Sequence, residues 1–367
     1  MEDLVMKNLF QGVYQGTKVL VTGHTGFKGS WLCLWLKALG AELTGFSLDP
    51  PSDPYHFDLL KLEMNHVIGD LRHEEDLQKV FDQAKPEMVF HLAAQPLVRR
   101  SYRNPAETFD TNVMGTVNLL EAVRNTASVK AVVNVTSDKC YDNKEWVWGY
   151  RENDPMGGHD PYSCSKGCAE LVTQSYQRSF FHGEGASRAL LASARSGNVI
   201  GGGDWGGDRL IPDVIRAVSK NETTHIRSPR AIRPWQHVLD PLSGYLMLGW
   251  RLLTGERKTA EAWNFGPTNP EAITVLSLVQ RMNELWQAVK FKVDQDPNAP
   301  HEVTFLKLDC TKAHHLLGWQ SVWTQAQAIS QTCRWYQSYL EEGKVISAEQ
   351  LKTYVEAARE QKLPWVM

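Results

Sequence analysis

Short apolar runs alternate with longer amphipathic segments from residue 18 to about residue 195. The runs have the length and β-branched composition of buried strands, and the segments between them repeat apolar positions at helical spacing. Strands are expected at 18–21, 42–48, 67–71, 88–94, 131–137 and 189–195. Helices are expected at 30–36, 74–85, 108–124 and 163–181. This alternation predicts an α/β fold, a doubly wound parallel sheet of the Rossmann type with helices on both faces.

Three glycines separate the first strand from the first helix, in the stretch KVLVTGHTGFKGSW that begins at Lys18. Gly23, Gly26 and Gly29 directly follow the strand and directly precede the helix. At such a turn the free N–H groups and the helix dipole attract negative charge, and glycines let a pyrophosphate approach the backbone. The stretch predicts a dinucleotide site, with a glycine-rich turn that binds nothing as the alternative.

Asp49 lies 20 residues beyond Gly29, directly after the second strand. A carboxylate at this distance accepts hydrogen bonds from the hydroxyls of an adenosine ribose. The next cationic side chain along the chain is Lys61, so a 2′-phosphate has no obvious partner near Asp49. Lys28, within the glycine turn, could reach such a phosphate. The pattern therefore favours NAD, and Lys28 leaves NADP open.

The alternation ends beyond Gly197, where residues 201–207 are expected to form a glycine-rich loop and 209–220 a helix. Irregular apolar segments follow around Trp235, Trp263 and Trp286. We expect a smaller, interleaved α/β substrate domain that covers the carboxyl ends of the strands. The predicted division is 17–200 with about 237–262 for the dinucleotide-binding domain, and 201–236 with 263–355 for the substrate domain.

Composition excludes several classes of protein. The chain of 367 residues is 42% hydrophobic and 22% charged with a net charge of −3, so a basic nucleic-acid binder is not expected. No run approaches the ~20 apolar residues of a membrane span, and the N-terminus lacks the basic start and apolar block of a signal peptide. The six cysteines include no C-x-x-C pair, so neither a disulfide framework nor a metal site is expected, and a cytoplasmic location fits.

Tyr162 and Lys166 lie four residues apart at the start of the last expected helix. Residues at this spacing share a helix face, so a phenol and an ammonium lie side by side. A tyrosine pKa must fall by roughly 3 units for the phenol to act as a base near neutral pH, and an adjacent ammonium and a nicotinamide cation would favour the phenolate. The spacing alone occurs by chance in many helices. The upstream glycine turn and the strand that ends in Thr136 and Ser137 favour a catalytic pair.

Together these motifs resemble the extended short-chain dehydrogenase/reductases, within them the branch that modifies nucleotide sugars, and most closely its 4,6-dehydratases. The spacing G-x-x-G-x-x-G is that of this superfamily, and the resemblance runs from Lys18 to about Trp319. It is carried by the three glycines, Asp70, the run 91–95, Asn112, the run 136–139, Tyr162 with Lys166, Arg195, Asn198 and the stretch 233–240. The residues expected to bind the cofactor are Gly23, Thr25, Gly26, Phe27, Gly29, Asp49, Asp70, Leu71, Leu92, Ala93, Ala94, Gln95, Thr136, Tyr162 and Lys166.

The run Ser137, Asp138 and Lys139 distinguishes a dehydratase from an epimerase. The resemblance implies that Ser137 holds the C4 hydroxyl of the sugar beside Tyr162, and that Asp138 protonates the departing C6 hydroxyl. Related dehydratases then carry a glutamate that removes the C5 proton. Lys139 stands at that position here, which leaves the C5 base open. The alternative is that Asp138 and Lys139 are only a polar strand end with its salt bridge.

The activity implied by the resemblance is that of a lyase acting on CDP-D-glucose. C4 is oxidised with NAD, water is lost across C5 and C6, and hydride returns to C6, which gives CDP-4-keto-6-deoxy-D-glucose. Such a product belongs to deoxysugar biosynthesis for surface polysaccharide, including O-antigen and lipopolysaccharide. A nucleotide-sugar 4-epimerase and a dehydratase of a dTDP or GDP sugar remain alternatives. A regulatory NAD-sensing protein typically loses the tyrosine or the lysine, and this chain has both.

Two arginines are candidate clamps for the substrate pyrophosphate, because the planar guanidinium matches phosphate oxygens. These are Arg209 and Arg233, and Asn198 is expected at the pyrophosphate or the ribose; either arginine could equally be a surface or interface residue. The cytidine base is implied by the resemblance alone. Helices near 112–124 and 166–181 match those that pair subunits in the family, so a homodimer is expected, with a tetramer open and with simple cover of the sheet as the alternative.

Overall fold

The computed structural model describes residues 6–50, 52–181, 189–226, 228–268, 273–294 and 306–367. Seven strands form one sheet in the order β10-β6-β5-β4-β1-β2-β3, and each neighbouring pair is parallel. They are β1 (Lys18–Thr22), β2 (Glu42–Ser47), β3 (Asn65–Ile68), β4 (Met88–His91), β5 (Ala131–Val135), β6 (Leu190–Ser196) and β10 (Ala262–Phe265). The order runs outward from β1 in both directions, which confirms the predicted doubly wound sheet and places its switch point between β1 and β4.

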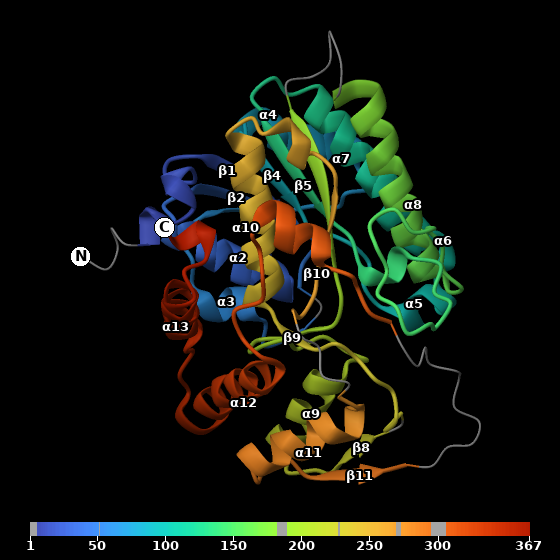
Figure 1. The fold of residues 1–367 in the computed structure, drawn as a ribbon, viewed down its shortest axis with the longest axis vertical. Coiled ribbons are helices and arrows are strands. Elements are labelled where there is room, and N and C mark those ends of the chain that lie inside the picture. Colours follow the sequence, from blue (N-terminus) through green and yellow to red (C-terminus); the bar gives the residue numbers. More distant parts are fainter. Residues whose placement is uncertain (1–5, 51, 182–188, 227, 269–272, 295–305) are drawn as a thin grey trace.

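Helices cover both faces of the sheet (Figure 1). One face carries α2 (Phe27–Ala38) and α10 (Leu239–Leu253), and the other carries α4 (Glu74–Ala84), α7 (Gly115–Arg124) and α8 (Pro161–Tyr176). Alternate strand residues point to opposite faces, so Val19 and Val21 lie in the core with α2 and α10, whereas Leu20 lies in the core with α4 and α7. The two cores hold the sheet between two layers of helices.

The helices around the sheet differ from the prediction: two of them contain π-type turns, and three short helices were not predicted. The helix expected at 108–124 is a π-type turn, η2 (Asp110–Met114), followed by α7, and α8 continues into a similar turn, η4 (Gln177–Phe181). Two short helices, α5 (Val98–Arg103) and α6 (Pro105–Phe109), precede η2, and α3 (His56–Leu60) follows β2. The six predicted strands of the main sheet agree with the structure to within a few residues, whereas β10 and the short strands outside this sheet were not predicted.

A smaller lobe lies at the carboxyl ends of the strands. β7 (Val199–Ile200) begins three residues beyond β6 and pairs with β9 (Gln236–His237), while β8 (Thr224–Ile226) pairs with β11 (Phe291–Val293). The helices α9 (Leu210–Ser219) and α11 (Val275–Leu285) lie beside β8 and β11 at the lower end of the view, with α12 (Gln325–Glu342) to the left of α9 (Figure 1). The predicted division into two domains stays a prediction; the main sheet itself extends to Phe265, at the end of β10.

Segments far apart in the sequence meet beside β1. The helical turn η1 (Leu9–Gly12) packs against η7 (Pro364–Val366), and the ring of Phe10 stacks on that of Trp365 with their centroids 5.2 Å apart. Trp365 also packs edge-on against Trp35 of α2, and α13 (Ser347–Glu360) contacts the same helix. This contact brings residues near the two ends of the described chain side by side.

Candidate functional site

The glycine turn between β1 and α2 is shaped by contacts that exclude side chains. Gly23 has φ +76°, and a Cβ added there would lie 2.7 Å from the backbone nitrogen of Ala93. A Cβ at Gly29 would lie 2.1 Å from the carbonyl oxygen of Gly23. Gly26 is the N-cap of α2 and supplies no capping side chain, so the first N–H groups of this helix face the turn. The turn fits a dinucleotide pyrophosphate.

The adenosine side of the predicted site lies beyond β2 and β3. Asp49 is exposed two residues after β2, where Thr25 Oγ1 bonds to Ser47 Oγ at 2.8 Å. Asp70, by contrast, accepts hydrogen bonds from the backbone N–H, the Nε and the Nη2 of Arg72 in a 2.6 Å ion pair, and these bonds hold the pKa of Asp70 below its ordinary value. The position of Asp49 therefore suits the predicted contact to a ribose, while the carboxylate of Asp70 is already paired.

Lys28 points away from Asp49. Its Nζ donates a hydrogen bond to Ser196 Oγ at 2.7 Å, at the end of β6, and lies 3.5 Å from Tyr245 Oη. In the sheet order β6 and β2 lie on opposite sides of β1, so this ammonium does not lie near a ribose held by Asp49. Burial lowers the pKa of Lys28 to about 7, with the charge of Asp138 opposing that shift. The sequence left NADP open because of Lys28, and this geometry removes that reason.

The residues after β4 form one wall of the site. Leu92, Ala93 and Ala94 are half-buried, and the small alanines leave room beside the glycine turn. Gln95 is buried, and its backbone N–H donates to Asn112 Oδ1 at 2.8 Å. Asn112 also donates to Ser165 Oγ at 2.9 Å, between the predicted catalytic residues of α8. Asn112 therefore ties this wall to the catalytic helix.

The amino terminus of α8 places Tyr162 in its first turn. Asp160 is the N-cap, its side chain accepts a hydrogen bond from the backbone of Ser163 at 2.9 Å, and Pro161 occupies the first helical position. The hydroxyl of Ser137, at the end of β5, hydrogen-bonds to the phenol of Tyr162 and donates to Asp138 Oδ1 at 3.0 Å. The structure therefore brings together the residues predicted to act at C4 and C6.

Burial controls the charges of the catalytic pair. It raises the pKa of Tyr162 to about 12, although the bond to Ser137 lowers it, and it lowers the pKa of Lys166 to about 8. The spacing of Tyr162 and Lys166 predicts that the neighbouring ammonium favours the phenolate of Tyr162. In the protein alone desolvation outweighs that effect, so the phenol needs a further cation close by before it can act as a base near neutral pH.

The structure brings one predicted substrate arginine close to the catalytic residues. Arg209 is the N-cap of α9, and its positive charge favours ionisation of Tyr162. Its Nη1 lies 3.1 Å from both carboxylate oxygens of Asp204, a buried residue of the glycine-rich loop. Asp204 was not predicted, because a single acid in a loop gives no signal of the arginine it will hold.

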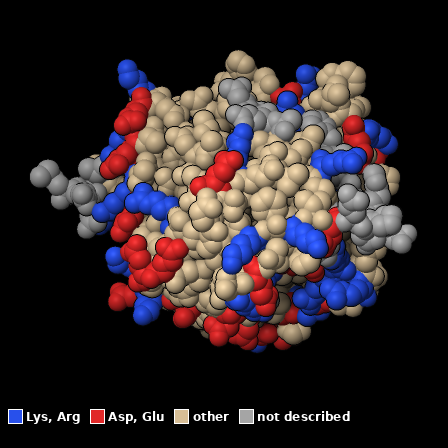
Figure 2. Space-filling model, turned by 90° about the horizontal axis from the view of Figure 1, so that it is seen from below, with Lys and Arg blue, Asp and Glu red and all other residues tan. Residues whose placement is uncertain are grey.

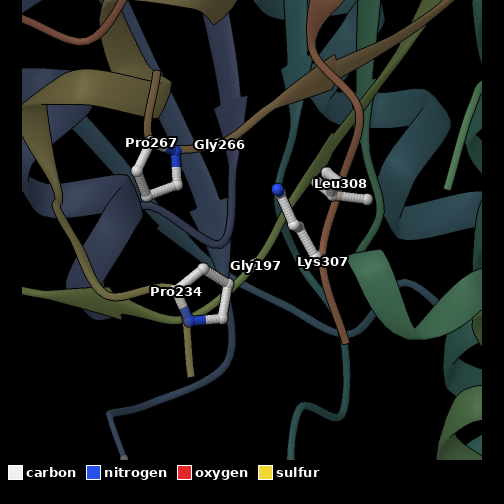
Figure 3. Close-up of a pocket in the computed structure, with 6 residues that line it drawn as sticks. All are labelled: Gly197, Pro234, Gly266, Pro267, Lys307 and Leu308. Atoms are coloured by element: carbon white, nitrogen blue, oxygen red, sulfur yellow. The ribbon is translucent and has the colours of Figure 1, made fainter. Parts of the chain in front are cut away.

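The other predicted substrate residues flank a small pocket beside Asp138. The Nη1 of Arg233 donates to the carbonyl of Ile232 at 2.9 Å, and the carbonyl of Asn198 accepts a bond from Gln236. The pocket is lined by Gly197, Pro234, Gly266, Pro267, Lys307 and Leu308 (Figure 3). A Cβ at Gly197 would lie 2.9 Å from Asp138 Oδ2, so the pocket adjoins the carboxylate that is predicted to act as the acid. Lys307, whose side chain extends into this pocket in Figure 3, was not predicted.

The described part of the chain contains no group of three or more His, Cys, Asp or Glu side chains that could hold a metal ion. It also contains no helix that is long and apolar enough to cross a membrane.

This combination defines the class of the protein. A glycine turn leads from β1 into α2, a buried tyrosine contacts a serine at the end of β5, and a buried lysine follows that tyrosine by one helical turn. That arrangement is the one expected of an extended short-chain dehydrogenase/reductase. The family model of GDP-mannose 4,6 dehydratase matches residues 20–332, and the chain belongs to this family.

Curated relatives and solved structures agree with this assignment. The chain is 51% identical to CDP-glucose 4,6-dehydratase of Salmonella typhimurium, over 94% of this chain and 98% of that protein. It is 25% identical to UDP-glucose 4-epimerase of Mycoplasma pneumoniae, over 88% and 97% of the two chains. An epimerase of Methanothermobacter thermautotrophicus matches with a TM-score of 0.77 at 26% identity, over 92% and 97% of the chains. The fold is also that of dTDP-glucose 4,6-dehydratase of Bacillus anthracis in complex with NAD, with a TM-score of 0.71 at 21% identity over 89% and 98%.

Proposed function

We propose that this protein is an NAD-dependent 4,6-dehydratase of CDP-D-glucose. The observation that carries the reaction type is the buried Asp138, bonded to Ser137 beside Tyr162. A carboxyl group at this place can donate a proton to a leaving hydroxyl, which an epimerase does not need. The choice of CDP-glucose is supported by the 51% identity to a CDP-glucose 4,6-dehydratase along nearly the whole of both chains.

The glycine turn, the alanines after β4 and the exposed Asp49 would hold NAD. When bound, NAD supplies an acceptor that takes hydride from C4 and later returns it to C6. The wall formed by Ala93 and Ala94 has no large side chain that would fill the space beside the turn. The remaining chemistry falls to side chains of this protein.

Each catalytic side chain then has one task. Tyr162 takes the proton of the C4 hydroxyl. Ser137, which is hydrogen-bonded to the phenol of Tyr162, holds that C4 hydroxyl in place. The resulting C4 ketone acidifies the C5–H bond. Asp138 gives its proton to the C6 oxygen as the C–O bond breaks, and the departing group leaves as water. Lys139, as the neutral amine or through a water molecule that it holds, accepts the C5 proton, and the same group gives a proton back to C5 when hydride returns to C6.

The charged end of the substrate would lie toward the smaller lobe. Arg209 is held in place by Asp204 near Tyr162, so it can contact the pyrophosphate while the hexose reaches the catalytic residues. Arg233 and Asn198, on either side of the pocket next to Asp138, are the other proposed contacts. Lys166 stabilises the phenolate of Tyr162 and the ribose end of the nicotinamide.

Product analysis tests the proposal. The purified protein with NAD would be incubated separately with CDP-glucose, dTDP-glucose, UDP-glucose and GDP-mannose, and each product examined by mass spectrometry and NMR. We expect CDP-glucose to lose one water and give a 4-keto-6-deoxy sugar, with no net accumulation of reduced cofactor. A product of unchanged mass with inverted C4 would mean a 4-epimerase. Turnover of another sugar in preference to CDP-glucose would overturn the proposed base.

We also propose that the protein is a cytoplasmic homo-oligomer that supplies deoxysugars for surface polysaccharide such as the O-antigen of lipopolysaccharide. The dimer would form through α7 and α8, which lie together on one flank of the molecule (Figure 1) and carry exposed Leu171 and, beside them, exposed Met114 and Phe180. On the face seen in Figure 2, acidic and basic side chains intermingle rather than forming a basic stripe, which agrees with a small-molecule partner. Light scattering of the wild type and of Leu171→Glu would distinguish a dimer, a tetramer and a monomer.

A further inference from the structure

A buried ion pair lies directly behind the catalytic pair. Glu170 follows Lys166 by one turn of α8, as Lys166 follows Tyr162, so the three side chains share one helix face. The Oε2 of Glu170 lies 2.7 Å from Nη2 of Arg195 on β6, and both side chains are fully buried. Neither residue was assigned a role by the mechanism above.

Glu170 joins the catalytic helix to the two strands that carry the opposite side of the site. Its Oε1 accepts a hydrogen bond from Thr136 Oγ1, and its Oε2 accepts one from Ser193 Oγ at 2.8 Å. Thr136 directly precedes Ser137 and Asp138, so a shift of Glu170 would move the predicted C4 and C6 residues relative to Tyr162. Both carboxylate oxygens are therefore used to fix the distance between the two halves of the site.

Arg195 is held on its other side as well. Its Nη1 donates to Tyr141 Oη at 2.7 Å and to the carbonyl of Glu152 at 3.0 Å. The hydroxyl of Tyr141 in turn donates to Asn264 Oδ1 at 2.8 Å, on β10. The ion pair is thus anchored in the sheet rather than only in the helix.

Glu170 is also the negative charge that most affects Lys166. Burial lowers the pKa of Lys166, and Glu170 raises it again. Besides Tyr162 on the same helix face, the other titratable groups facing Lys166 are Cys140, which has the same direction of effect, His91 from β4 and Lys28 from α2. His91 is neutral because burial lowers its pKa to about 3, and Lys28 is a like charge. Glu170 is therefore the one carboxylate among these groups.

A need for stability does not by itself explain a buried ion pair, because apolar residues of similar volume often stabilise a protein equally well or better. We propose that Glu170, held by Arg195, is a positioning residue of the dehydratase reaction. It keeps the Lys166 ammonium charged and fixes the end of β5, with Ser137 and Asp138, against Tyr162. The catalytic part of this inference rests on the proposed function; the coupling between Glu170 and Lys166 does not.

The test compares the titration of Lys166 in three variants. Glu170→Gln removes the charge and keeps the shape of the side chain. Glu170→Asp keeps the charge but shortens the side chain by one methylene group. The double variant Glu170→Gln with Arg195→Met removes both charges, so that no unpaired guanidinium is left buried. NMR of isotope-labelled lysine side chains follows the titration, with Lys166→Arg to assign the signal. We expect the midpoint of Lys166, about 8 in the wild type, to fall by roughly 1–3 units in Glu170→Gln and to change little in Glu170→Asp.

Turnover provides the second readout. The alkaline limb of the kcat profile for CDP-glucose should move to lower pH with the Lys166 midpoint in Glu170→Gln and in the double variant, and stay in place in Glu170→Asp. Asp240→Asn is the control, because Asp240 is an equally buried carboxylate whose partners are Val322 and Tyr354. The Asp240→Asn variant should be less stable than the wild type but should keep the alkaline limb of its kcat profile at the same pH. Thermal unfolding would report the folded fraction of every variant.

The outcomes separate the two proposals. If the Lys166 midpoint and the alkaline limb of the folded double variant and of Glu170→Gln both match those of the wild type, the positioning role is wrong and the pair is only structural. If the midpoint shifts but the wild type does not convert CDP-glucose, the coupling stands and the proposed function fails.

Discussion

The proposed cofactor end and the proposed catalytic end of this site are built in different ways. The cofactor end is made of backbone: Gly23 and Gly29 are glycines because any Cβ would meet main-chain atoms within 3 Å. The catalytic end is made of buried side chains, and Tyr162, Asp138 and Lys166 are each less than 10% exposed. A backbone turn needs only local spacing, whereas the charges at the catalytic end depend on partners from distant strands. Added side-chain volume in the glycine turn should therefore lower the affinity for the cofactor. Changes in charge among the buried side chains should instead lower the rate of turnover.

The largest effect is expected from Tyr162→Phe. The variant loses the proton acceptor for the C4 hydroxyl, so the rate of C4 oxidation should fall by about 10²–10⁴-fold. Binding of the reduced cofactor, followed by fluorescence titration, should stay within twofold of wild type if the two ends are independent. A variant that keeps more than about a tenth of the wild-type kcat would remove Tyr162 from this role.

Asp138→Asn should divide the reaction into two steps. The amide can still hydrogen-bond to Ser137 but cannot give a proton to the C6 oxygen, so elimination should slow by about 10²-fold while oxidation at C4 survives. Rapid mixing with CDP-glucose should then show the absorbance of enzyme-bound reduced cofactor. Elimination at the wild-type rate would show that Asp138 is only a structural carboxylate.

Gly29→Ala tests the cofactor end by volume alone. The new Cβ would lie 2.1 Å from the carbonyl oxygen of Gly23, and relief of such overpacking typically costs ~1–3 kcal/mol. Cofactor affinity should fall by about 10–100-fold in a calorimetric titration. Gly207→Ala is the matched control, since an added Cβ there meets no atom within 4 Å. Equal affinities of the two variants would contradict the view of the turn as a close-fitting backbone site.

The smallest effect is expected from Asp49→Asn. Loss of a charged hydrogen-bond acceptor for the ribose should cost about 1.5 kcal/mol, or roughly tenfold in the affinity for NAD. The same change should narrow the preference for NAD over NADP, because it removes a negative charge near a 2′-phosphate. Asp53→Asn, in the same exposed segment, is the control. An unchanged NAD affinity would place the ribose elsewhere.

Most of the sheet could be predicted because its strands are short, apolar and separated by amphipathic helices. α10 was missed for a physical reason: it is buried nearly all round, from Leu239 to Leu252, and so lacks the polar face that marks a helix in a sequence. The strand β10 was missed because the four residues AWNF are too few to show a period.

The site could be predicted only where it depends on local spacing. The glycine turn and the pair Tyr162–Lys166 are of this kind. The partners that set charge and position are distant in the sequence: Thr136 lies 34 residues from Glu170, and Arg195 lies 25 residues from it. A single sequence carries no signal for such pairs. The direction of the Lys28 side chain was likewise unpredictable, because its partner Ser196 lies 168 residues away.

The stacking of Phe10 on Trp365 also constrains how the chain can acquire its structure during synthesis. A ribosome releases the residues of α2 long before it reaches Trp365, yet Trp35 of that helix, Phe10 and Trp365 belong to one buried cluster. Until residue 365 has emerged, Phe10 and Trp35 lack the contact that Trp365 makes with both of them. These two rings therefore stay without that cover while more than 300 residues are synthesised after Trp35, and the cluster closes only once Trp365 has left the ribosome.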